Sequence, residues 1–116
     1  MADVLLIIKG YQKHKLAGIL SATGHKVCLA EGLSAAVQLT KTKRDLDVVI
    51  LDRQPANQEE NDLRLVLQWR LRYAKWLFLA SLPNPLSKEE LVEAVSLAWN
   101  KARQIKERKQ PIDAAL

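Results

Sequence analysis

The sequence predicts one α/β domain, built on an open parallel sheet of about four strands with helices on both faces. Four short apolar runs alternate with four segments whose apolar residues recur at helical spacing. Strands that alternate with helices form parallel sheets through right-handed crossovers. The length of 116 residues fits one domain, and 48% hydrophobic with 27% charged residues indicates a folded core. We expect a single domain over residues 1–109 and a flexible tail over 110–116.

The first half of the chain holds three predicted strands and two predicted helices. Apolar runs predict strands at residues 4–8, 26–30 and 46–51. The first helix should end before Gly24, which suits a left-handed C-cap. The second helix should be capped by Ser34 and end at the basic cluster that follows it, residues 41–44.

The second half holds a third helix, a fourth strand and a last helix. A polar loop is expected over residues 53–61, followed by a third helix up to Tyr73 and a strand at 76–80. Ser87 and Glu90 form a capping-box pattern. That pattern opens a helix with one apolar stripe: Leu91, Val95, Ala98, Ala102 and Ile105.

The sheet should stop at four strands. Only five residues separate Ser81 from Ser87, and a crossover to another parallel strand needs at least about 10–12. The fourth strand should therefore lie at or near an edge of the sheet. An apolar edge strand favours pairing with a second copy.

Several kinds of site and location are excluded by composition. With Cys28 as the single cysteine, no internal disulfide or multi-cysteine zinc site can form. His14 and His25, both expected to be exposed, are too few for a metal centre, so we expect no metal and no cofactor. No apolar run approaches the roughly 20 residues that span a bilayer, and the opening residues lack a basic segment. We expect a cytoplasmic protein without membrane contact.

Functional groups of open parallel sheets collect at the carboxyl ends of the strands. Lys9 and Gly10 follow the first predicted strand, Asp52 the third and Ser81 the fourth. These residues resemble the receiver domain of two-component response regulators. The resemblance rests on Ala30-Glu31-Gly32, the strand that ends in Asp52, and the Asn84-Pro85 step into the last helix.

The resemblance implies a CheY-like (flavodoxin-like) sheet that lacks one helix–strand unit of a full receiver. It also implies that Asp52 occupies the position of the phosphorylated aspartate and Ser81 that of the conserved hydroxyl. In the family, Mg²⁺ binds an acidic pair where this chain has Lys9 and Gly10, and a lysine stands in place of Asn84. An ammonium group cannot ligate Mg²⁺ and repels it.

These departures predict a degenerate receiver in which Asp52 is not phosphorylated. Phosphoryl transfer depends mainly on positioning and charge neutralisation, which need the missing metal. We expect Lys9 and Asp52 to form an ion pair in place of the metal; the alternative is two solvated charges. The chain is not expected to be an enzyme.

We expect a protein–protein interaction module of bacterial signal transduction or transcription regulation, with a signalling or transcription protein as its partner. A homodimer, joined at the edge strand or by exchange of the last helix, would cover the apolar edge. The candidate interface residues are Trp76, Leu77 and Phe78. Of the three tryptophans, Trp69, Trp76 and Trp99, at least two should pack in the core.

Two other functions stay open. One is an atypical receiver that is phosphorylated on Asp52 without the usual metal pair. The other is a small basic protein that associates with nucleic acid. The net charge of +5 is within what solubility alone favours, and no groove-reading motif is present, so nucleic acid is the less favoured partner. The candidate basic residues are Arg64, Arg70, Arg72, Lys101, Arg103, Lys106, Arg108 and Lys109.

Overall fold

A four-stranded parallel sheet forms the centre of the molecule. The computed structural model describes the backbone of residues 2–8, 10, 12–52, 54–79 and 87–115, and the side chains of the same residues except 12 and 106–115. The strand order is β2-β1-β3-β4 and every pairing is parallel, which confirms the predicted architecture. The elements are β1 (Asp3–Ile7), α1 (Gln12–Ala22), β2 (Lys26–Ala30), α2 (Leu33–Leu39), β3 (Val48–Leu51), α3 (Gln58–Arg70), β4 (Lys75–Phe78) and α4 (Lys88–Ala115).

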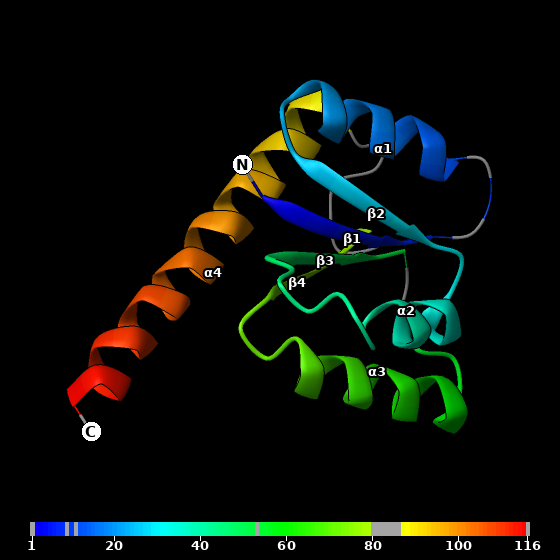
Figure 1. Cartoon of the computed structure of the whole chain (residues 1–116). Helices are drawn as coiled ribbons and strands as arrows, with labels where there is room; N and C mark the ends of the chain where they lie inside the picture. Colours follow the sequence, from blue (N-terminus) through cyan, green and yellow to red (C-terminus); the bar gives the residue numbers. More distant parts are fainter. Residues whose placement is uncertain (1, 9, 11, 53, 80–86, 116) are drawn as a thin grey trace.

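Successive side chains of the central strand β1 enter two different apolar layers. Val4 and Leu6 pack with α1 and α4, whereas Leu5 and Ile7 pack with α2 and α3. Figure 1 shows these two helix pairs on opposite sides of the sheet. Because both faces of β1 and β3 are covered, these strands need continuous apolar runs rather than alternating ones.

The sheet ends at β4, as the sequence predicts. β4 pairs with β3, with Leu51 opposite Phe78, and has no second neighbour among the described strands. β4 ends at Phe78 and α4 begins at Lys88, a separation in sequence that is too short for another crossover. The buried stripe of α4 packs against the chain's own sheet through Leu91, Val95, Ala98 and Ala102.

Most predicted helix ends are confirmed, and three are wrong. α3 begins at Gln58, inside the stretch expected to be a loop up to Asn61, because the Asn57 side chain caps it by accepting a hydrogen bond from the Glu60 amide at 2.8 Å. Gly24 has a left-handed φ of 94° after α1, and the Ser87 Oγ accepts a hydrogen bond from the Glu90 amide at 3.1 Å. Ser34, however, does not cap α2. The cap is Gly32 with extended backbone, and Ser34 lies inside the first turn. The third helix ends at Arg70, three residues before the predicted end at Tyr73, because the backbone of Leu71 leaves the helical region.

The last helix runs well past the sheet. α4 continues to Ala115, and Figure 1 shows its orange and red part extending beyond the sheet. The flexible tail expected over residues 110–116 stays a prediction. No helix in the described ranges is both long and apolar enough to cross a membrane.

His25 is buried, contrary to the expected exposure; His14 is exposed as expected. The Nδ1 of His25 accepts a hydrogen bond from the backbone N of Ala2 at 3.1 Å. Its ring meets that of Trp99 edge-on, with the centroids 6.1 Å apart. His25 therefore joins the start of β1 to α4. Burial, and secondarily the positive N-terminus, lower the pKa of His25 below its ordinary value.

Because its pKa is lowered by folding, neutral His25 favours the folded state. This stabilisation is complete above the unfolded pKa of about 6.5 and is lost as the pH falls through the folded pKa. We expect the free energy of unfolding, measured by urea denaturation, to fall between about pH 7.5 and pH 5.5. His25→Asn, which retains an acceptor, should flatten this dependence, whereas His14→Asn should leave it unchanged. An equal pH dependence in wild type and His25→Asn would refute the assignment.

Candidate functional site

The carboxyl ends of β1 and β3 lie side by side. Ile7 pairs with Leu51, so the residues that follow each strand reach the same edge of the sheet. Asp52 follows β3 directly and is half-buried there. Lys9, Ser81 and Asn84, which the sequence also places at this edge, lie outside the described residues. The ion pair between Lys9 and Asp52 therefore stays a prediction.

Gly10, in the turn after β1, has a backbone conformation that favours glycine. Its φ is 95°, and a Cβ atom built on it would have nothing within 4 Å. The constraint is therefore the backbone angle, since space is available. An aspartate would be strained at this position. The backbone at Gly10 therefore disfavours an aspartate, whose carboxylate could ligate a metal ion.

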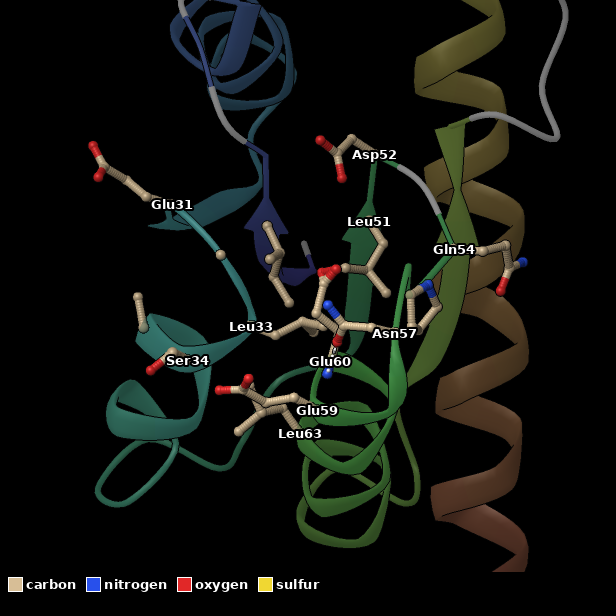
Figure 2. Close-up of a pocket in the computed structure, with 14 residues that line it drawn as sticks. Glu31, Leu33, Ser34, Leu51, Asp52, Gln54, Asn57, Glu59, Glu60 and Leu63 are labelled. Carbon is tan, nitrogen blue, oxygen red and sulfur yellow. Dashed lines mark hydrogen bonds between the residues drawn. The ribbon is translucent and has the colours of Figure 1, made fainter.

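A pocket of about 610 Å³ opens beside Asp52. Figure 2 shows it between the ends of the central strands and the first turns of α2 and α3. Among the described residues that line it, four are acidic and none is basic. The acids are Glu31, Asp52, Glu59 and Glu60.

Two of these acids have structural partners. Lys13 Nζ donates to Glu31 Oε1 at 2.8 Å, and Figure 2 shows Glu31 directed away from Asp52. Glu60 Oε1 accepts a hydrogen bond from the Ala56 amide at 3.3 Å. Among the described side chains, no group of three or more His, Cys, Asp or Glu could hold a metal ion. The acids of the pocket are thus spread around it rather than gathered on one point.

Among the described residues that line this pocket, three further carboxylates accompany Asp52. Phosphorylation would add further negative charge to a pocket already lined by carboxylates. Transfer of a phosphoryl group is favoured by cations that neutralise the developing charge, and no basic side chain lines this pocket in the described part of the chain.

The candidate basic residues do not form one surface. α3 packs with α2 on one side of the sheet, and α4 packs with α1 on the other. Arg64 and Arg70 on α3 are therefore separated by the sheet from Lys101 and Arg103 on α4. The side chains of Lys106, Arg108 and Lys109 lie outside the described residues.

The candidate interface residues of β4 are half-buried. Trp76 and Phe78 pack against the layer of α2 and α3, and Leu77 packs against the layer of α1 and α4. The other backbone edge of β4 pairs with none of the described strands. A dimer at this edge remains a prediction.

Two of the three tryptophans pack against the core, as expected. Trp76 and Trp99 do so, whereas Trp69 on α3 is 73% exposed. Trp69 was not predicted from the sequence to be a surface residue. A helical wheel could have identified it, because the core stripe of α3 runs through Leu63, Leu67 and Leu71, and Trp69 lies off it.

Comparison with known proteins shows the fold. No family model and no curated protein matches the sequence. Among solved structures, the chain is similar to NtrX from Brucella abortus, a response regulator crystallised in complex with ADP. The TM-score is 0.73 at 16% sequence identity, over 95% of this chain and 29% of the NtrX chain. The chain thus spans less than a third of NtrX, and what the two share is the receiver-like fold.

Proposed function

We propose that the chain is a non-catalytic receiver-like module that acts through contacts with other proteins in bacterial signal transduction or transcription regulation, in the cytoplasm. The observation that carries this proposal is the acid-lined pocket beside Asp52. Its described lining residues include three further carboxylates and no basic side chain. A phosphorylated Asp52 would be repelled there, so a phosphorylation switch is disfavoured.

The residues at the family's other site positions support the same conclusion. Lys9 and Gly10 stand where receivers carry the acidic pair that binds Mg²⁺, and Asn84 stands where they carry a lysine. Lys9 and Gly10 supply no carboxylate for Mg²⁺, and Asn84 supplies no ammonium group. The left-handed backbone of Gly10 disfavours even a single aspartate in the turn after β1. With the chemistry disfavoured, the surfaces of the fold remain as its means of action.

The experiment is incubation of the protein with acetyl phosphate and Mg²⁺, followed by intact-protein mass spectrometry under conditions that preserve acyl phosphates. Transfer would form a bond between an Asp52 oxygen and phosphorus and release acetate. We expect wild type and Asp52→Asn to give the same spectrum, with no phosphoryl adduct. An active receiver treated in parallel verifies the donor. An adduct in wild type that disappears in Asp52→Asn would overturn the proposal and select the atypical phosphorylated receiver.

A further inference from the structure

The outward face of α3 carries an apolar patch. Leu65 is 50% exposed, Val66 40% and Trp69 73%. Trp69 lies three and four residues after the other two, so the side chains are neighbours on one face of the helix. Single exposed apolar residues are ordinary, but a contiguous group that includes a tryptophan marks an interaction surface. We call this group the α3 patch.

Arg72, in the turn after α3, stacks on the ring of Trp69 and so restrains that side chain. Its Cζ lies 5.5 Å from the centroid of the Trp69 ring and 5.0 Å from that of Tyr73. Trp, Tyr and Arg are the residues most enriched at the energetic centres of protein interfaces. A side chain ordered before association loses less entropy when it binds. The patch is therefore partly organised in the single chain.

Charges flank the α3 patch with opposite signs at its two ends. Glu59 and Asp62 are exposed in the first half of α3, and Arg72 is exposed beyond its last turn. The ion pairs that the described side chains form within the molecule involve none of these three residues. Along α3, this face is acidic near the start of the helix, apolar in the middle and basic just beyond the end.

Such a face is complementary to itself when two copies pack antiparallel. About a twofold axis that crosses the outward face of α3 at the level of residue 67, position 65 of one helix faces position 69 of the other, and position 62 lies toward the turn of the other copy that holds Arg72. Leu65 then covers Trp69 of a second copy, and Asp62 meets Arg72. Twofold interfaces require this kind of self-complementary patch. We propose that α3 mediates an antiparallel homodimer of this protein.

A second copy fits this face better than nucleic acid does. A polyanion laid along α3 would meet the carboxylates of Glu59 and Asp62, and Leu65 and Val66 would gain little from phosphates. A helix of 13 residues is only about 20 Å long and offers less than the area of a standard interface. We therefore expect a concentration-dependent equilibrium between monomer and dimer. The inference goes beyond the proposed function, because self-association and phosphorylation are independent properties that fail in separate experiments.

The test is sedimentation equilibrium of the whole chain over a range of concentrations. Wild type should dimerise, and Trp69→Glu should raise the dissociation constant at least about tenfold. The matched control is Leu97→Glu, an exposed leucine of α4 on the other side of the sheet, which should leave the constant unchanged. A monomeric wild type, or a dimer that survives Trp69→Glu, would overturn the proposal.

A charge-reversal pair tests the register of the two helices. Asp62→Arg alone places two guanidinium groups together at the contact with Arg72 of the second copy, and Arg72→Glu alone places two carboxylates together. Each variant should dimerise at least about threefold more weakly than wild type, by the energy of exposed charge pairs. An equimolar mixture of the two variants can form a heterodimer in which both contacts again pair opposite charges.

In a heterodimer of the two variants, the new arginine at position 62 of one copy faces the new glutamate at position 72 of the other. The second contact joins the unchanged Arg72 and Asp62, so both contacts again carry opposite charges. The mixture should therefore recover dimerisation as a heterodimer. Failure of the mixture to associate more tightly than either variant would refute the antiparallel register.

Discussion

Replacing Val95 with aspartate is expected to remove at least about 4 kcal/mol from the free energy of unfolding at neutral pH, a large share of the stability of a small domain. Val95 is 0% exposed and lies in the apolar layer between the sheet and α4. A carboxylate placed there would have no partner, and burying an unpaired charge costs at least about 4 kcal/mol. Small domains are stable by only about 5–15 kcal/mol. Beside α1, α4 is the helix that covers this face of the sheet in the described structure, so its release exposes the core.

Leu97→Asp is the matched control for this prediction. Leu97 lies two residues further along the same helix and is 55% exposed, so the substitution changes helix propensity similarly without burying a charge. We expect a loss below about 1 kcal/mol. Urea denaturation followed by circular dichroism measures both variants. Equal destabilisation by the two substitutions would contradict the packing of α4 against its own sheet.

Leu6→Ala is expected to lower the free energy of unfolding by about 3 kcal/mol. Leu6 is 0% exposed at the centre of β1, and truncation of a buried leucine costs about 2–5 kcal/mol through lost burial and a residual cavity. Leu29 is its neighbour in the sheet, directly paired on the edge strand β2, but it is 41% exposed. Leu29→Ala should therefore cost less than about 1 kcal/mol. A larger effect for Leu29→Ala would mean that β2 is not an open edge.

The order of strands and helices could be predicted because apolar runs and capping residues determine where each element forms. The run from Val4 to Ile8 is apolar at every position, which suits a strand covered on both faces. Ser87 and Glu90 cap α4, and Gly24 ends the turn after α1 with a left-handed backbone. These are interactions between residues close in sequence, and they can be predicted without the tertiary structure.

Features that depend on distant residues were missed. His25 reads as an exposed residue between a helix and a strand, but Ala2 and Trp99 bury it from far along the chain. The end of α2 also contacts a residue distant in sequence, because Arg70 of α3 donates a hydrogen bond to the Val37 carbonyl at 2.7 Å. Nothing in either local sequence indicates these contacts.

The candidate site was predicted in part. The position of Asp52 at the carboxyl edge follows from the strand it ends, and the pairing of β1 with β3 places it beside the turn of Gly10. The acidic lining could not be predicted in the same way. Glu59 and Glu60 join Asp52 only because α3 begins close under the end of β3, and the loop before α3 has no periodicity from which its path can be read.

We propose that the carboxyl edge of the sheet holds neither Mg²⁺ nor a phosphoryl group. The most direct measurement is a titration of the ¹⁵N-labelled protein, first with Mg²⁺ and then with beryllium fluoride, a mimic of the phosphoryl group on aspartate. We predict that the backbone amide signals of Gly10 and Asp52 do not shift in a saturable way with either addition. Saturable shifts at both residues, abolished by Asp52→Asn, would contradict the claim.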